Sequence, residues 1–305
     1  MIDYLTRRLL STIPLLFVIL LGSFLFMRSA PGGPFDSDRS LPPQIEANLQ
    51  AKYHLDEPVL QQFGRYLGGL LRGDLGPSFK YQGRTVNEII AQSLPVSLTL
   101  GASALFLALL IGVPLGVFGA LYHNQFRDYA LMSVALLGIC VPNFVLGPIL
   151  IIVFAFGVGW LPAGGWGTGA QLILPAVTLG AIRAAYVARL ARAGMLDVIG
   201  QDFIRTARAK GLHERVVVSK HALRLAILPV LSYMGPATAS ILVGSVVVER
   251  IFNIPGLGTF FVNSALNRDY TMAMGTVLLY SALLITLNLI VDLLYAVVDP
   301  RVELK

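Results

Sequence analysis

Residues 202–229 read D-F-I-R-T-A-R-A-K-G-L-H-E-R-V-V-V-S-K-H-A-L-R-L-A-I-L-P, a basic island between two long apolar segments. Asp202 suits the N-cap of a helix, and Gly211 suits the position just after a helix C-terminus. The helix predicted between them, residues 203–210, is about 12 Å long and has its arginines on one face and its apolar residues on another. Isolated helices shorter than roughly 12–15 residues are marginal in water. The rest of the chain or a partner must therefore hold this helix.

The same stretch resembles a loop of the ABC-importer permeases. F-I-R-T-A-R-A-K-G-L at 203–212, followed by K-H-A-L-R-L-A-I-L-P-V-L-S-Y-M-G-P at 220–236, is similar to the EAA loop of the peptide and nickel branch. The start Arg205-Thr206-Ala207 and the long interval from Gly211 to Pro229 differ from the sugar-permease form, but both are usual in the peptide branch. The alternative is an ordinary basic cytoplasmic loop. The resemblance implies a coupling helix that docks on an ATPase subunit through Phe203, Ile204, Arg205, Thr206, Ala207, Arg208, Ala209, Lys210, Gly211 and Leu212.

The composition indicates an integral membrane protein. Of 305 residues, 55% are hydrophobic and 13% are charged, with a mean hydropathy of +0.72, whereas soluble domains carry about 25% charged residues. The net charge is +6, and residues 183–224 hold nine Lys/Arg and three acids, a surplus of six that equals the whole excess. This concentration indicates membrane topology rather than a nucleic-acid surface. Cys140 is the single cysteine, which excludes an intrachain disulfide.

Six apolar stretches are long enough to cross a bilayer, which needs about 20 residues. An even number of spans puts both termini on one side, and the N-terminal arginines, the basic island and the C-terminal charges then all face the cytoplasm. A cleavable signal peptide is the alternative for the first stretch, but its apolar run would be about 7–15 residues. The predicted spans are Leu9–Met27, Leu98–Tyr122, Tyr129–Phe156, Leu172–Arg192, Leu225–Val248 and Gly275–Val298.

We divide the chain into residues 1–95, the first helix with an external loop; residues 96–298, a permease domain; and residues 299–305, a cytoplasmic tail. The external loop, residues 28–95, has seven Lys/Arg and seven Asp/Glu and so lacks a positive bias. We predict short amphipathic helices at 45–53 and 59–71 within it. The loop is either a solvated loop or an external cap or docking surface for a substrate-binding protein.

No catalytic chemistry is predicted. The chain lacks G-x-x-x-x-G-K-[ST], so it should not bind ATP through a P-loop. Its four histidines, at 54, 123, 213 and 221, lack the spacing of zinc ligands. We therefore expect no cofactor or metal in this chain, with ATP and magnesium bound by separate ATPase subunits.

Polar residues at membrane depth are candidates for a translocation path. They are Asn143, Arg183, Asn288 and Asp292, and Glu249 is expected at the membrane interface. Arg183 could instead extend its side chain to the cytoplasmic interface, and Asn288 and Asp292, four residues apart, could form a polar bridge between helices. Pro142 and Pro229 are expected to kink their helices.

Further motifs extend the resemblance over nearly the whole chain. E-R-I-F-N-I-P-G-L-G at 249–258, N-R-D-Y at 267–270 and D-P-R at 299–301 are similar to peptide-permease signatures. The resemblance is to the B-type transmembrane subunit of oligopeptide or dipeptide importers, and nickel or antimicrobial-peptide transport stays open. It implies a type I importer fold, all-α with six transmembrane helices and a cytoplasmic coupling helix, in the bacterial cytoplasmic membrane. The implied partners are a homologous second permease, two cytoplasmic ATPase subunits, and a periplasmic or lipid-anchored peptide-binding protein.

A self-sufficient secondary carrier is the other class considered. It would predict inverted repeats and ion ligands within the membrane. The sequence shows neither, and such a carrier would leave the basic loop unexplained.

Overall fold

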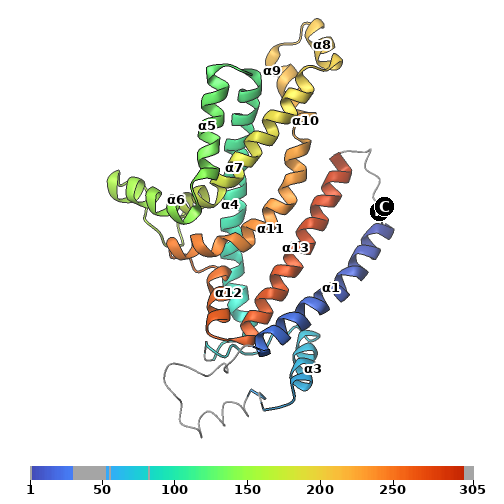
Figure 1. Ribbon diagram of the computed structural model, residues 1–305, viewed down its shortest axis with the longest axis vertical. Helices are drawn as coiled ribbons and strands as arrows, with labels where there is room; N and C mark the ends of the chain where they lie inside the picture. Colours follow the sequence, from blue (N-terminus) through green and yellow to red (C-terminus); the bar gives the residue numbers. More distant parts are fainter. Residues whose placement is uncertain (1, 30–52, 55, 82, 299–305) are drawn as a thin grey trace. The chain divides into compact units, whose positions relative to one another are not determined.

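The computed structural model describes residues 2–29, 53–54, 56–81 and 83–298, and within these ranges the chain is helical apart from turns and one isolated bridge between Pro77 and Thr85. This confirms the predicted all-α class; the tail at 299–305 lies outside the described residues. The elements, in chain order (Figure 1), are α1 (Ile2–Ser29), α3 (Val59–Leu70), α4 (Val86–Leu121), α5 (Phe126–Cys140), α6 (Asn143–Leu150), the π-helical η1 (Ile151–Gly157), α7 (Gly169–Ile199), α8 (Asp202–Ala209), α9 (Glu214–Val216), the π-helical η2 (Val217–Ala222), α10 (Leu223–Ala226), α11 (Leu228–Ile251), α12 (Leu257–Leu266) and α13 (Tyr270–Val298).

Four helices, in α1, α4, α7 and α13, are long and apolar enough to cross a membrane, and the number rises to six if each of two bent pairs is one span. The bent pairs are α5 with α6–η1, and α9–α10 with the first part of α11. If both bent pairs are spans, each of the six segments overlaps one of the six predicted spans. The predicted ends were less accurate, because α4 begins twelve residues earlier than expected and α7 runs seven residues past Arg192.

The third predicted span is not one continuous helix. Its two halves meet at 107° between Cys140 and Asn143. Pro142 is the N-cap of α6, and Val141 before it is extended, with φ −99° and ψ 113°. A proline disfavours helical geometry in the preceding residue, because its ring crowds that residue's backbone. The expected kink at Pro142 is therefore a sharp break. The bend before α11, where Pro229 lies in the first turn, is 52°.

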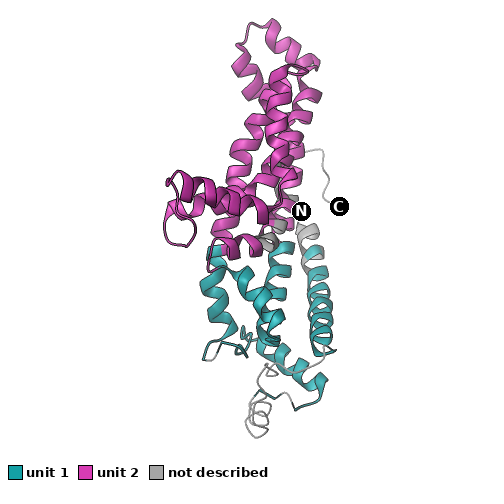
Figure 2. Ribbon diagram, turned by 60° about the vertical axis from the view of Figure 1, so that its left-hand side comes forward, with its two compact units in different colours: residues 1–96, 256–285, 305 teal, residues 97–255, 286–304 magenta. Residues whose placement is uncertain are grey.

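The described residues form two compact units, which Figure 2 colours separately. Unit 1 contains residues 2–96 and 256–285, and unit 2 contains residues 97–255 and 286–298. In unit 1, Leu20 and Phe24 of α1 pack with Phe63 of α3 and Met274 of α13, and the rings of Phe24 and Phe63 are 5.2 Å apart. The domains predicted from the sequence, with boundaries at residues 95 and 298, are continuous segments, whereas each compact unit combines separate stretches of the chain. That division stays a prediction.

Small residues let α7 pack tightly inside unit 2. A Cβ added at Gly116 of α4 would lie 2.3 Å from the carbonyl oxygen of Ala188, and one at Gly138 of α5 would lie 2.5 Å from that of Ala181. Such spacing requires glycine, and close backbone approach is how membrane helices gain van der Waals contact without a hydrophobic driving force. Helix α7 is therefore held directly against α4 and α5, and it leads to α8.

Candidate functional site

Helix α8 forms where the sequence predicted a coupling helix. It spans Asp202–Ala209, one residue earlier than expected, with Gln201 rather than Asp202 as the N-cap. Gly211 has φ +75°, which confirms the predicted left-handed residue beyond the helix end. Its backbone N–H donates to the carbonyl of Arg208 at 2.9 Å.

The chain itself holds this short helix in place. Ile204 is 0% and Ala207 6% exposed, and both lie in one apolar cluster with residues of α4, α7, η2 and α10. The other members of this cluster are Val117, Ala120, Met195, Val198, Val217, Ala222 and Ala226. Phe203 was expected to share their face, but it is 38% exposed. Two apolar anchors thus supply the stability that eight residues cannot supply alone.

The opposite side of α8 is open and mostly basic. Arg208 donates from Nη2 to Glu214 Oε1 at 2.6 Å and from Nε to Glu214 Oε2 at 3.1 Å, which ties the helix end to α9. Arg205 reaches Asp202 at 3.3 Å. The predicted coupling residues that are exposed are Phe203, Arg205, Thr206, Arg208, Ala209, Lys210, Gly211 and Leu212. The surface that α8 offers to a partner therefore excludes Ile204 and Ala207.

A buried ion pair joins α5 to α7 near this segment. Asp128 is 1% exposed, and Arg192 donates to it twice, from Nη2 at 2.6 Å and from Nε at 2.8 Å. The backbone N–H of Asn124 donates to the same carboxylate at 3.1 Å, and His123 Nδ1 lies 3.0 Å from Arg192 Nη2. Bidentate geometry suits the planar guanidinium. The Asp128 carboxylate thus accepts three hydrogen bonds, so the pair has a structural role. This pair was not predicted from the sequence.

Arg183, also on α7, has a different environment. It is half-buried, and its Nη1 donates to the Tyr233 hydroxyl of α11 at 3.3 Å. The rings of Tyr233 and Tyr186 are 5.7 Å apart, and the guanidinium of Arg189 lies 5.1 Å from the Tyr186 centroid. Among the described side chains, Arg183 has no carboxylate within ion-pair distance. We call these four residues the arginine–tyrosine cluster.

Among the described residues, no hydrogen bond connects the other path candidates to the arginine–tyrosine cluster. Asn143 begins α6, and its Oδ1 is buried without a partner. Asn288 is half-buried on α13, and the side chain of Asp292 lies outside what the structure describes. Glu249, expected at the membrane interface, is fully buried and accepts a hydrogen bond from Ser97 at 2.7 Å. Within the described residues, no three His, Cys, Asp or Glu side chains could hold a metal ion.

Comparisons with known proteins agree with this architecture. A model of the family described as "Binding-protein-dependent transport system inner membrane component" matches residues 112–304. The Escherichia coli K12 protein named "Oligopeptide transport system permease protein OppB" is 49% identical over 305 residues, covering 99% of this chain and 100% of the relative. The Bacillus subtilis protein named "Dipeptide transport system permease protein DppB" is 42% identical over 304 residues, covering 100% and 99%.

A solved structure supports the fold. The permease of an inward-facing MetNI methionine ABC transporter aligns with a TM-score of 0.58 at 19% identity, over 69% of this chain and 96% of that one. At this identity the likeness concerns the fold alone. The family follows from the sequence matches, which span the chain. The chain therefore belongs to the inner membrane components of binding-protein-dependent transport systems, the permease subunits of ABC importers.

Proposed function

We propose that this chain is the permease subunit through which an ATP-driven importer moves oligopeptides across the bacterial cytoplasmic membrane. The observation that carries the proposal is the identity of 49% to an oligopeptide permease over 99% of this chain and 100% of that relative. Dipeptide transport is the second candidate, because a dipeptide permease is 42% identical over the same length.

Uptake by the reconstituted transporter separates these cargoes. Proteoliposomes that contain the complete complex, with its binding protein and internal ATP, should accumulate labelled tetra- and pentapeptides. Unlabelled pentapeptide should compete for this uptake far better than unlabelled dipeptide or nickel. Uptake of dipeptide alone, or of nickel alone, would replace the proposal by the corresponding alternative.

The chain is proposed to work without catalysis of its own. Its partners would be a homologous second permease, two ATPase subunits that bind ATP and magnesium, and a periplasmic or lipid-anchored binding protein. Helix α8 supports this assembly, because its exposed basic side is fixed to the chain's core through Ile204 and Ala207. A force applied to α8 by an ATPase would pass into α4, α7 and α10.

The coupling role has a matched test. Phe203 and Leu212 are exposed apolar residues beside the basic side of α8, at 38% and 39%. Replacing both with serine should uncouple ATP hydrolysis from peptide delivery while the protein remains folded. Leu266→Ser is the control, because Leu266 is 71% exposed on α12, far from α8 in the sequence. Wild-type, peptide-stimulated hydrolysis in the double variant would remove the coupling role from α8.

The proposed orientation puts both termini and α8 in the cytoplasm and residues 28–95 outside. Single cysteines at Asp56 and Arg215, both exposed positions, test it in a Cys140→Ala background. An impermeant maleimide should label position 56 in intact cells and position 215 only after lysis. Labelling of position 215 in intact cells would contradict the proposed orientation.

Within the membrane, Arg183 is the proposed contact for passing cargo, and Asn143, Asn288 and Asp292 remain path candidates. Arg183 lies nine residues before Arg192, about 13.5 Å along the helix. If the Asp128–Arg192 pair marks the cytoplasmic end of the span, Arg183 lies well inside it. An arginine at such depth costs roughly 2.5–3.5 kcal/mol on insertion scales, so a transient carboxylate partner gives it a role.

A further inference from the structure

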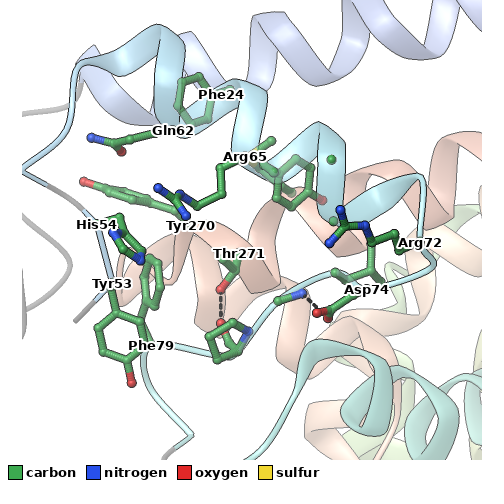
Figure 3. A pocket seen from close by; sticks show the side chains of 17 residues that line it. Phe24, Tyr53, His54, Gln62, Arg65, Arg72, Asp74, Phe79, Tyr270 and Thr271 are labelled. Carbon is green, nitrogen blue, oxygen red and sulfur yellow. Dashed lines mark hydrogen bonds between the residues drawn. The ribbon is translucent and has the colours of Figure 1, made fainter. Parts of the chain in front are cut away.

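A cavity of about 560 Å³ opens in unit 1, between α3, the loop after it and the first turn of α13. Figure 3 shows Arg72 and Asp74 at one end and Tyr53, His54, Phe79 and Tyr270 at the other, with Arg65 between them. This volume lies within the range of small-ligand sites, roughly 300–1,000 Å³. The arrangement places charge at one end and aromatic rings at the other.

Hydrogen bonds fix the loop wall of the cavity to α13. Asp269, 0% exposed, accepts from the Ser78 hydroxyl and from the backbone N–H of Phe79 at 3.1 Å. It also accepts from the N–H of Met272 at 3.2 Å, which caps α13. The Thr271 hydroxyl donates to the carbonyl of Pro77 at 2.5 Å. The cavity is therefore preformed, because its loop and its helix are joined through a buried carboxylate.

The aromatic end consists of three rings in edge-to-face contact. Tyr53 and Phe79 meet edge to face with centroids 4.9 Å apart, and Phe79 and Tyr270 are 6.2 Å apart in the same manner. Such faces bind apolar and aromatic side chains. Because these rings pack against one another, the surface that a ligand would contact is already ordered.

At the charged end, the guanidinium of Arg72 is available to a ligand. Two arginines and one aspartate line the cavity. Arg65 is paired with Glu57 at 2.6 Å, and Asp74 accepts from the N–H of Gly76 at 2.9 Å. The guanidinium of Arg72 has no hydrogen bond or ion pair with any described residue. A carboxylate is the ligand group that suits it best, because a guanidinium can bind both oxygens at once.

We propose that this cavity binds the C-terminal part of a peptide, with its free carboxylate on Arg72 and an apolar or aromatic side chain, a few residues earlier, against Tyr270 and Phe79. The inference rests on the proposed function and orientation, which make peptide the cargo and place the cavity outside. An exposed arginine gives a weak contact, of up to about fivefold in affinity. Weak binding suits a site that receives cargo and releases it.

A photoreactive tetrapeptide, Ala-benzoylphenylalanine-Ala-Ala, tests the site on the complete transporter in nanodiscs without binding protein. The free acid should crosslink to residues of the cavity, as located by mass spectrometry, more strongly than the C-terminal amide. Arg72→Gln should lower the free-acid yield about fivefold and leave the amide unchanged. Arg84→Gln is the matched control, because Arg84 lies on the same loop, outside the cavity, and donates to Gln92.

A pair of glycines on α3 adds a steric test. A Cβ at either Gly64 or Gly68 would meet nothing within 4 Å, but only Gly68 lines the cavity. Both Gly→Leu changes should favour the helix by a similar amount. Gly68→Leu should therefore block crosslinking of both peptides, and Gly64→Leu should leave it intact.

Equal labelling by acid and amide, or no effect of Gly68→Leu, would overturn the proposal. In a separate reaction with a photoreactive binding protein, labelling of the cavity by that protein but not by the peptide would also overturn the proposal, because this surface would then be a protein docking site. ATP-driven peptide uptake is measured in parallel on the same variants in proteoliposomes that also contain the binding protein and internal ATP, because a nanodisc has no interior. Uptake without labelling of the cavity removes this inference alone, whereas absence of peptide uptake removes the proposed function.

Discussion

Two arginines on α7, nine residues apart, have opposite environments. Arg192 gives two hydrogen bonds to the buried carboxylate of Asp128, at 2.6 and 2.8 Å. Arg183 gives one bond, at 3.3 Å, to the neutral hydroxyl of Tyr233. The first charge is neutralised inside the protein. The second has no carboxylate among the described side chains.

This difference separates a structural role from a functional one. A charge that is expensive to place in a membrane is retained either because the fold neutralises it or because a ligand does. Arg192 satisfies the first condition, as its partner is 1% exposed. Arg183 fails it, which makes Arg183 the stronger candidate for contact with cargo.

The largest effect is expected when Arg192 is replaced. Arg192→Leu leaves the Asp128 carboxylate buried without its guanidinium, and only His123 at 3.6 Å and the Asn124 N–H at 3.1 Å stay beside it. The loss should cost about 3–5 kcal/mol. The variant should be lost from the membrane fraction or melt far below wild type in detergent. Thermal unfolding of the purified transporter, followed by size-exclusion fluorescence, measures this.

A double variant identifies the cause. Asp128→Leu with Arg192→Met removes both charges, and replacing a buried pair by apolar residues is often neutral or stabilising. The double variant should recover most of the lost stability. If it is as unstable as Arg192→Leu, the buried carboxylate is not the reason for the loss.

The second effect concerns transport rather than folding. Arg183→Leu should leave the melting temperature near wild type, because no buried carboxylate loses its partner. Peptide uptake should fall about 10- to 100-fold, the range for a lost hydrogen bond to a charged group. Arg183→Lys, which keeps the charge but not the fork, should retain partial uptake. Normal uptake with leucine would leave a snorkelling arginine as the better account.

A smaller effect is expected from Tyr233→Phe. The change removes the hydroxyl that orients Arg183 and keeps the ring that contacts Tyr186. The donor of this bond is charged, but the bond is long, at 3.3 Å, so we expect the lower end of the range for bonds to charged groups, roughly 1.5 kcal/mol, and a fall in uptake of about tenfold. The fall should disappear when Arg183 is already leucine. Additive losses in the double variant would show that Tyr233 acts independently of Arg183.

The smallest effect is expected from Arg189→Gln. Arg189 is exposed and contacts the Tyr186 ring at 5.1 Å. An exposed cation–π contact is worth about 0.5–1 kcal/mol, so uptake should change less than about fivefold. If Arg189→Gln lost as much uptake as Arg183→Leu, Arg189 would become a candidate for the contact with cargo.

Periodicity and charge predicted the membrane class, six spans and the position of α8, because apolar length and glycine punctuation are local properties. They placed Gly211 correctly at the helix end, since only its backbone conformation mattered. They predicted a kink at Pro142 but not the 107° break between α5 and α6, because the size of a bend depends on how the two halves pack. Residue 203 was assigned to the wrong side because tertiary contacts, not spacing, decide which face of so short a helix is buried.

The candidate site was less accessible from sequence. Arg183 was conspicuous as a charge in an apolar run, but its partner Tyr233 lies 50 residues away on another helix. Asp128 falls between two predicted spans, Leu98–Tyr122 and Tyr129–Phe156, and its partner Arg192 lies 64 residues later. Pairings of this kind are set by helix packing. The i+3 spacing of Arg183, Tyr186 and Arg189 was the one local signal that could have indicated a shared face.

The most direct test of the central claim compares two forms of one peptide. Uptake of a pentapeptide as free acid and as C-terminal amide is measured in proteoliposomes that contain wild-type protein or Arg183→Leu, and each variant rate is divided by the wild-type rate for the same peptide. Our account predicts that Arg183→Leu loses most uptake of the free acid and spares the amide. Equal fractional losses for the two peptides, or no loss for either, would contradict it.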